Sequence, residues 1–277
     1  MTSDWIFSTQ DVLIAFGLTL FAGLSTGIGS AIAFFAKKTN TRFLSVALGF
    51  SAGVMIYLSF VEIFPKANEI LAGELGPQSA YMLTVIAFFS GMFLIALIDR
   101  LVPDFENPHE IKRVEQMQLD SSQAAKNKKL YRMGVMSAVA IALHNFPEGL
   151  ATFLAALQDI KLGLPIAIAI AIHNIPEGIA ISVPIHHATG SKRKAFTYSF
   201  LSGLAEPLGA LIGFFILMPF INDVVFGFLF ASVAGIMVFI SIDNLLPAAR
   251  EYGEHHLSVY GLAGGMALMA LSLVFFL

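Results

Sequence analysis

Apolar residues run along this chain in long blocks that short polar connections separate. Eight blocks are long enough, at about 20–25 residues, to cross about 30 Å of hydrocarbon as helices. By residue number they cover 12–36, 43–65, 80–102, 133–157, 162–186, 195–219, 225–247 and 258–277. No further block of globular type is left over. The pattern predicts an all-α integral membrane protein with eight transmembrane helices, formed by residues 1–277 as a single domain.

The connection at about 103–132 is the longest polar segment and contains the run DSSQAAKNKK. Its polar, charged composition predicts a flexible loop between the third and fourth helices. All Lys and Arg residues except Lys66 and Lys161 fall in the connections after the first, third, fifth and seventh helices. Because such residues concentrate on the cytoplasmic side of membrane proteins, these connections are predicted to be cytoplasmic and both termini extracytoplasmic.

The overall composition agrees with a polytopic membrane protein, since 57% of residues are hydrophobic and 13% charged, with a mean hydropathy of +0.78. A net charge of −3 gives no indication of a nucleic-acid partner. The chain has no cysteine, which excludes disulfides, thiolate catalysis and cysteine-held metal sites. Any metal must therefore bind His, Glu, Asp or Asn side chains, backbone carbonyls or Met thioethers.

A six-residue motif occurs twice near the middle of apolar blocks, as HNFPEG at 144–149 and HNIPEG at 173–178. Ionisable side chains at that depth cost about 2.5–3.5 kcal/mol each on insertion scales, so they indicate a functional site. In each copy the His and the Glu are four residues apart and share a helical face, and the Asn shares an edge with the Glu. The proline in each copy frees a backbone carbonyl, and the glycine after each Glu allows close helix approach.

Two such helices facing each other would bring together imidazoles, carboxylates and amide oxygens, with a third carboxylate on the sixth helix. These candidate metal ligands are His144, Asn145, Glu148, His173, Asn174, Glu177 and Glu206. Two cations bridged by Glu148 and Glu177 would neutralise the carboxylates better than one. Mixed imidazole and carboxylate ligands suit Zn²⁺ and first-row divalent ions better than Ca²⁺ or Mg²⁺. For a single intramembrane His, a hydrogen-bonded core role is the ordinary interpretation, and the number of matched polar residues argues against it here.

An internal repeat relates the second and seventh helices. Residues 52–69 and 234–251 share seven identities without gaps, including a Pro and a Glu. The two copies are predicted to cross the membrane in opposite directions, as are the two motif helices. This indicates inverted repeats, with helices 1–3 and 6–8 around a central 4/5 pair in a 3+2+3 arrangement, which is typical of alternating-access transporters. The alternative is that small residues recur only because they suit helix packing.

Further polar residues suggest an ion path. Met55, Glu62 and Glu69 are seven residues apart and share a face of the second helix, and a corresponding face of the seventh ends at Glu251. The hypothesis is that the first face guides ions in and the second guides them out. His255 and His256, on the cytoplasmic side, could receive departing metal. The alternatives are a gap-filling core role for Met55 and ordinary solvated charges or imidazoles at the other positions.

With the paired motif on its central helices and SGLAE on the sixth, the whole chain resembles the ZIP (Zrt/Irt-like) family of divalent metal permeases, in its bacterial ZupT-type branch. The resemblance implies a binuclear site. One ion would be held by His144, Glu148, His173 and Glu177, with Met55 as a further candidate. The other would be held by Asn145, Glu148, Asn174, Glu177 and Glu206. It also implies a homodimer in the plasma (inner) membrane and an elevator-type movement of helices 1, 4, 5 and 6 against 2, 3, 7 and 8.

The predicted function is import of zinc and other divalent ions (Fe, Mn, Co, Cd) into the cytoplasm, with the ion as transported substrate and no prosthetic group. The predicted partners are these ions, the lipid bilayer and a second copy of the chain. One alternative is a transporter of another solute whose His/Glu cluster relays protons. Another is an intramembrane metalloenzyme, but the usual zinc motif places Glu directly after the first His, whereas Asn145 follows His144 here. We therefore expect no enzymatic activity.

Overall fold

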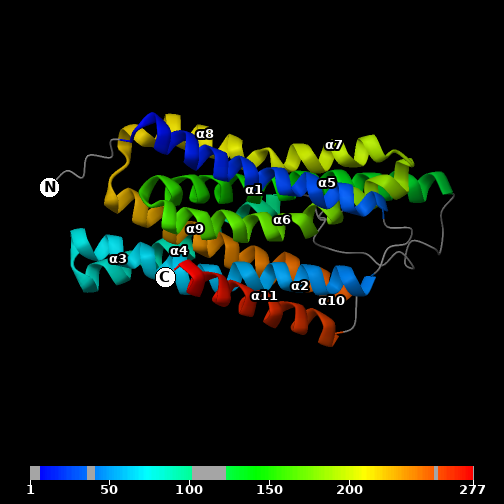
Figure 1. Ribbon diagram of the computed structural model, residues 1–277. Coiled ribbons are helices and arrows are strands. Elements are labelled where there is room, and N and C mark those ends of the chain that lie inside the picture. The colour runs from blue at the N-terminus through cyan, green and yellow to red at the C-terminus, as the bar shows by residue number, and fades with distance from the viewer. Residues whose placement is uncertain (1–6, 36–40, 102–122, 253–254, 277) are drawn as a thin grey trace.

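The computed structural model describes residues 7–35, 41–101, 123–252 and 255–276, and throughout these ranges the regular elements are helices (Figure 1). Within the described residues, seven helical segments are long and apolar enough to cross a membrane. They are Thr9–Ile32, Ser45–Leu75, Pro77–Arg100, Ile160–Thr189, Lys192–Leu217, Asp223–Arg250 and His256–Val274. Seven of the eight predicted blocks thus have a matching span, and the prediction of an all-α integral membrane protein is confirmed.

The fourth predicted block, 133–157, is the one without a matching span, and it lies within helix α5 (Gln123–Gln158). Because α5 begins at Gln123, the last part of the loop predicted over 103–132 is helical instead. The physical reason is the run QAAKNKKLYR, whose Gln, Ala, Lys, Leu and Arg residues are strong helix formers despite their polarity. The loop prediction for 102–122 lies outside the described residues.

The remaining elements follow the chain with short connections. Before α5 they are α1 (Thr9–Phe35), α2 (Thr41–Leu58), the π-helical turn η1 (Ser59–Ile63), α3 (Phe64–Leu75) and α4 (Pro77–Leu101). After it they are α6 (Ile160–Thr189), α7 (Lys192–Gly203), α8 (Ala205–Leu217), the 3₁₀ turn η3 (Met218–Phe220), α9 (Asp223–Ile240), the π-helical turn η4 (Ser241–Leu245), α10 (Leu246–Tyr252) and α11 (His255–Phe276).

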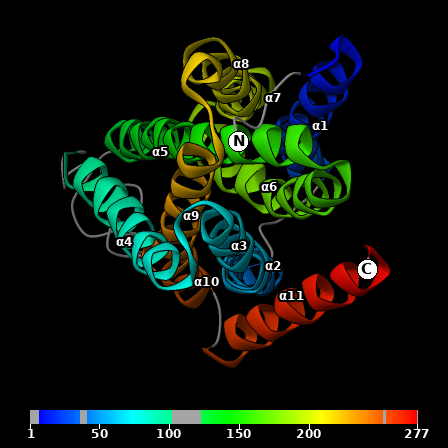
Figure 2. The ribbon, with the colours of Figure 1, turned by 90° about the vertical axis from the view of Figure 1, so that its left-hand side faces the viewer.

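The helices pack as two bundles (Figure 2). The motif bundle consists of α1, α5, α6, α7 and α8, in which α6 packs most extensively on α1 and α5, and α5 also packs on α8. The repeat bundle consists of α2, α3, α4, α9, α10, α11 and the two π turns, with α2 packed on α11 and α4 on α9. The bundles meet mainly where α2 contacts α6 and α5 contacts α9, and these contacts are less extensive than the main helix pairs inside each bundle.

Glycines bring backbones together inside each bundle. At many glycines, a Cβ atom added to the residue would lie closest to a backbone carbonyl oxygen of another helix. For the described glycines of this kind, that helix belongs to the same bundle as the glycine. Examples are Gly149 at Glu206 and Gly178 at Thr26 in the motif bundle, and Gly53 at Leu262 and Gly235 at Phe88 in the repeat bundle. Such contacts let membrane helices approach closely and pack tightly. Each bundle is therefore held together by contacts that leave little room for internal sliding.

The internal repeat extends from the sequence to the backbone. The π turns η1 and η4 occupy corresponding positions in the two copies, and a proline follows each turn at Pro65 and Pro247. In each copy the hydroxyl of the first residue in the turn donates to a Met carbonyl at 2.7 Å, from Ser59 to Met55 and from Ser241 to Met237. A proline ring crowds the carbonyl one turn earlier, and a π turn supplies the extra residue that relieves this crowding.

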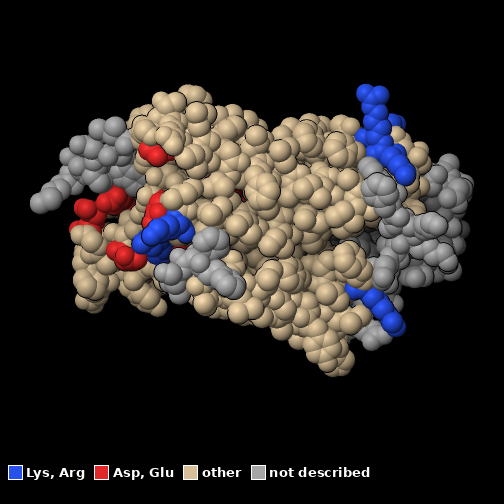
Figure 3. Space-filling view, viewed as in Figure 1, with Lys and Arg blue, Asp and Glu red and all other residues tan. Residues whose placement is uncertain are grey.

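The surface separates charge from apolar area. On the face that Figure 3 shows, Lys and Arg lie at one end, while Asp and Glu gather at the other end beside a further basic patch. Between the ends, large apolar side chains are exposed on several helices, including Phe21, Phe93, Phe215 and Leu271 at 51–72% exposure. An apolar belt of this kind needs lipid rather than water around it. Together with the seven apolar helices, it indicates a multi-pass membrane protein.

Candidate metal centre

The two motif copies lie on α5 and α6, which form an antiparallel hairpin. The connection is short, and the side chain of Asp159 caps α6 by accepting from the Lys161 backbone N–H at 2.8 Å. This turn lies between the two copies. In this hairpin the His of each copy contacts the Glu of the other copy.

The resulting pairs are reciprocal and buried. His144 Nε2 lies 3.1 Å from Glu177 Oε1, and His173 Nε2 lies 3.3 Å from Glu148 Oε2. All four residues have at most 4% exposure. Burying carboxylates at this depth is costly unless opposite charge or hydrogen-bond donors compensate. The imidazoles provide that compensation, so the four side chains form one electrostatic unit across the hairpin.

The two motif asparagines are oriented by backbone carbonyls of neighbouring helices. Asn174 Nδ2 donates to the Ala22 carbonyl of α1 at 2.9 Å and also to Glu206 Oε1. Asn145 Nδ2 donates more weakly to the Ser202 carbonyl of α7, at 3.4 Å. Because the amide nitrogens are used in this way, both amide oxygens are left for other partners, and Glu206 on α8 is drawn to the same site.

Five buried side-chain oxygens of the site have no hydrogen-bond partner. They are Asn145 Oδ1, Glu148 Oε1, Asn174 Oδ1, Glu177 Oε2 and Glu206 Oε2. Buried polar atoms are rarely unpaired, because each costs about 1–3 kcal/mol when left without a partner. All five are acceptors, so a proton donor or a cation would satisfy them. Carboxylate and amide oxygens beside imidazole nitrogens form a donor set that fits a divalent first-row cation.

The described residues nevertheless contain no group of three or more His, Asp or Glu side chains already arranged to hold a metal ion. The imidazoles instead contact carboxylates of the opposite motif copy. The nitrogen of each contact cannot bind a carboxylate and a cation at once. An entering cation would therefore have to take the place of the two His–Glu contacts, with small side-chain rotations inside the hairpin.

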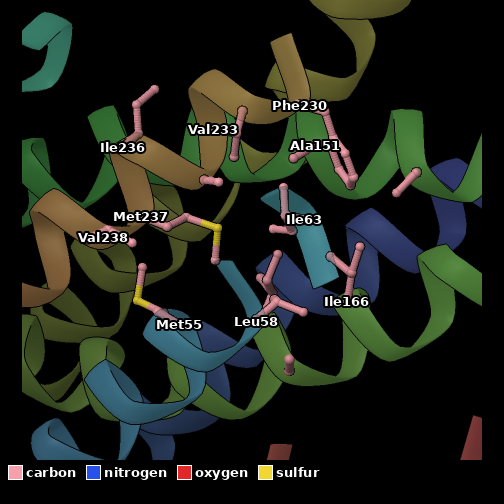
Figure 4. Packing of buried hydrophobic residues seen from close by; sticks show 14 of the residues in the cluster. Met55, Leu58, Ile63, Ala151, Ile166, Phe230, Val233, Ile236, Met237 and Val238 are labelled. Atoms are coloured by element: carbon pink, nitrogen blue, oxygen red, sulfur yellow. The ribbon is translucent and has the colours of Figure 1, made fainter. Parts of the chain in front are cut away.

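Met55 is fully buried on α2. Figure 4 shows it in an apolar cluster that also contains Leu58, Met237 and Val238. These apolar surroundings suit the alternative interpretation of Met55, a side chain that fills a gap in the core. Its role as a metal ligand stays a prediction.

The residues predicted to guide ions lie in different surroundings. Glu62 is partly buried on the π turn η1, whereas Glu69 is exposed and forms an ion pair with Lys66 at 3.0 Å. His256 is exposed, and its ring stacks on Tyr260 with centroids 6.3 Å apart. The side chains of Glu251 and His255 lie outside the described residues. The proposed entry and exit roles of all these residues stay predictions.

Sequence reasoning missed the backbone groups that orient the site. The Ala22 and Ser202 carbonyls hold the asparagine amides, and the Ser51 hydroxyl of α2 donates to the His173 carbonyl at 3.5 Å. A carbonyl carries no residue-specific signal, so these contacts could not be found from the sequence. The only available hint was the density of small residues on α1 and α7, which allows neighbouring backbones to come close.

Comparison with known proteins gives a consistent result. A family model described as ZIP Zinc transporter matches residues 104–273, a range that includes both motif copies. The zinc transporter ZupT of Nitratidesulfovibrio vulgaris is 65% identical over 272 residues, which cover 96% of this chain and 98% of that protein. The zinc transporter ZupT of Streptococcus mutans is 63% identical over 269 residues, covering 97% of this chain and 100% of that protein.

Proposed function

The chain belongs to the ZIP family as a ZupT-type transporter, and on this premise we propose that it carries Zn²⁺ into the cytoplasm through the buried site between α5 and α6. Relatives that match over nearly their whole length and are named as zinc transporters support zinc as the transported ion, and they are transporters rather than enzymes. The observation that carries the proposal is the pair of reciprocal His–Glu contacts surrounded by five unpartnered oxygens.

We propose two neighbouring ion positions that share the carboxylates of Glu148 and Glu177. The His144, Glu148, His173 and Glu177 side chains would hold one ion, with Met55 as a further candidate. The Asn145, Glu148, Asn174, Glu177 and Glu206 side chains would hold the other. Each shared carboxylate supports this arrangement, because one of its oxygens contacts an imidazole and the other has no partner. The same donor types would accept Fe²⁺, Mn²⁺, Co²⁺ or Cd²⁺.

We propose that α5 is a further transmembrane helix, the fourth along the chain, which brings the total to eight and gives the 3+2+3 arrangement of inverted repeats. The packing of α5 supports this, since its neighbours α6 and α8 are both parts of candidate spans. The matched π turns η1 and η4 support a common origin for the second and seventh spans. The whole chain would then be one transporter domain, with the segment around 102–122 as a cytoplasmic connection.

We propose that the motif bundle moves as one body against the repeat bundle, in an elevator-type cycle. All candidate ligands except Met55 lie on α5, α6 and α8, so the complete site would move with its bundle. The glycine contacts that join helices inside each bundle support rigid-body movement. Met55 and Met237 belong to a core cluster that also contains side chains of the motif bundle, such as Ile166 of α6, and flexible apolar side chains can repack as surfaces slide.

We also propose a homodimer, as the family resemblance implies. The spans of α4 and α11 are the least buried of the seven, with 28% and 22% of their most apolar windows inside the chain. Their exposed apolar faces could be covered by lipid or by a second copy. Chemical cross-linking distinguishes coverage by lipid from coverage by a second copy. A dimer gives a cross-linked species whose yield does not fall when the membrane is diluted with added lipid.

The first test of function is zinc flux into proteoliposomes by the wild-type protein and by His144→Ala. We expect the variant to lower saturable zinc flux about 10–100-fold, the range found when groups that support a metal site are removed. Wild-type flux in the variant would reject His144 as a ligand. Transport of another solute that a zinc chelator leaves unchanged would favour the proton-relay alternative over metal transport.

The proposed orientation can be tested because the chain has no cysteine of its own. Asp159→Cys and Lys192→Cys place single thiols just before α6 and at the start of α7, where both natural side chains are exposed. We expect a membrane-impermeant maleimide added to intact cells to label Asp159→Cys and not Lys192→Cys. After permeabilisation both should react. The reverse pattern would show that the orientation inferred from basic residues is wrong.

A further inference from the structure

An apolar groove of about 310 Å³ lies where α2, α6 and α11 meet. Its walls include Val54 of α2, Ala169 and Ile172 of α6, and Leu268, Met269 and Ser272 of α11. Ser272 contributes the one polar side chain of this lining. All three helices belong to candidate membrane spans, so the groove lies within the apolar layer of the molecule.

The two halves of α11 differ in how they meet their neighbours. In its first half, Gly261 and Gly265 bring α11 against the backbone of α2 at Val46 and Phe50. After Gly265 the chain contains no further glycine, and large residues such as Leu268 and Met269 occupy the helix. In this half, Leu268 and Met269 line the groove beside Ala169 of α6.

From this setting we propose that the groove binds one acyl chain of a membrane lipid. Water is a poor occupant, because a buried water needs two to four polar partners and this lining offers a single hydroxyl. An empty apolar space is also unfavourable, since the surrounding atoms lose their dispersion contacts. Hydrocarbon is the solvent at this depth, and Leu268 and Leu271 at the rim are 41% and 60% exposed to it.

The position of the groove couples its occupancy to transport, and this step rests on the proposed movement of the two bundles. One wall, α6, belongs to the motif bundle, while α2 and α11 belong to the repeat bundle. Ile172 in that wall directly precedes the candidate ligand His173. Movement of α6 must change the shape of the groove. A lipid acyl chain that fits the present shape therefore stabilises this conformation of the protein over others. Lipid composition would thereby set the resting state of the transporter.

Photolabelling tests the binding without requiring transport. The wild-type protein is reconstituted in dioleoylphosphatidylcholine vesicles containing a small fraction of phosphatidylcholine with a diazirine on one acyl chain, irradiated and analysed by peptide mass spectrometry. We expect label on Ala169 and Met269, which are only 3% and 2% exposed, in addition to exposed positions such as Phe93. Label confined to exposed faces would overturn the proposal. The groove would then be empty or covered by a second copy of the protein.

A matched pair of variants separates the groove from the rest of α11. Ser272→Phe places a ring in the groove, whereas Ala267→Phe adds the same ring at an exposed position of the same helix that does not line it. We expect Ser272→Phe to lose label at Ala169 and to reduce zinc flux, and Ala267→Phe to retain both. If Ser272→Phe retains label at Ala169, the proposed binding of an acyl chain is wrong. If it loses this label but keeps wild-type zinc flux, the proposed coupling of the groove to transport is wrong. Because labelling needs no zinc, failure of the proposed zinc transport would leave this binding result intact.

Discussion

Glu148→Gln is expected to abolish saturable zinc flux. Glu148 is fully buried, contacts His173 at 3.3 Å through Oε2 and has no partner for Oε1. The substitution keeps the size of the side chain but removes a negative charge and turns one acceptor into a donor. Both proposed ion positions use this carboxylate, so both lose a ligand. Removing a group that merely supports a metal ligand lowers metal affinity or activity about 10–100-fold. Because Glu148 is proposed as a ligand itself, we expect zinc flux to fall by at least about a hundredfold.

The measurement is uptake of radioactive zinc into proteoliposomes at several zinc concentrations. Glu74→Gln is the matched control, because it makes the same chemical change at an exposed position of α3 away from the site. It should retain wild-type uptake. Thermal unfolding in detergent checks that Glu148→Gln is folded. A folded Glu148→Gln protein with wild-type uptake would contradict the shared-carboxylate site.

The convergence of the two motif copies could be predicted from the sequence, whereas the identity of the contacting pairs was not. A helical face shared by residues four apart, together with opposite helix directions, is enough to bring the copies together. Which His meets which Glu depends on the turn and on how α5 and α6 are rotated and shifted against each other, and the structure places His144 against Glu177. Helix boundaries are the part of a sequence interpretation that is least well determined, so this register had to come from the structure.

The two π turns show a similar limit. The repeat was visible as identities between 52–69 and 234–251, including the serine and proline that flank each turn. The sequence gives no direct sign of one extra residue in a helical turn, because the signal is a backbone hydrogen bond from Phe64 to Ser59 and from Leu246 to Ser241. Helical periodicity applied without this insertion places Glu62 and Glu69 on one face. The π turn between Ser59 and Ile63 shifts that register for residues beyond it.

The start of α5 was mispredicted for an energetic reason. Polarity dominated the interpretation of 103–132, since polar segments between apolar blocks are usually loops. Residues 123–132 have high intrinsic helix propensity, and they extend a helix already nucleated by the apolar block that follows. Continuing an existing helix avoids the cost of nucleation. Polarity there indicates a position outside hydrocarbon, not absence of helix.

Gly149→Ala is expected to damage both stability and transport by separating α5 from α8. A Cβ at this position would overlap the carbonyl oxygen of Glu206 and lie too close to its Cα, and backbone atoms cannot move aside as a side chain can. The helices must therefore move apart. Overpacking of this kind costs about 1–3 kcal/mol. The movement also carries Glu206 away from Asn174, with which it shares a hydrogen bond at the site.

Gly17→Ala isolates this effect, because an added Cβ at Gly17 of α1 has no atom within 4 Å. Replacing Gly by Ala inside a helix normally stabilises it by about 0.5–1 kcal/mol, so the control should unfold at the same or a higher temperature than wild type. Gly149→Ala should unfold at a lower temperature and carry less zinc. Since both variants gain the same helix propensity, the difference between them measures the overlap with α8. Equal unfolding temperatures and equal zinc flux for the two variants would mean that α8 can retreat without disturbing Glu206, and that the close α5–α8 contact does not position the site.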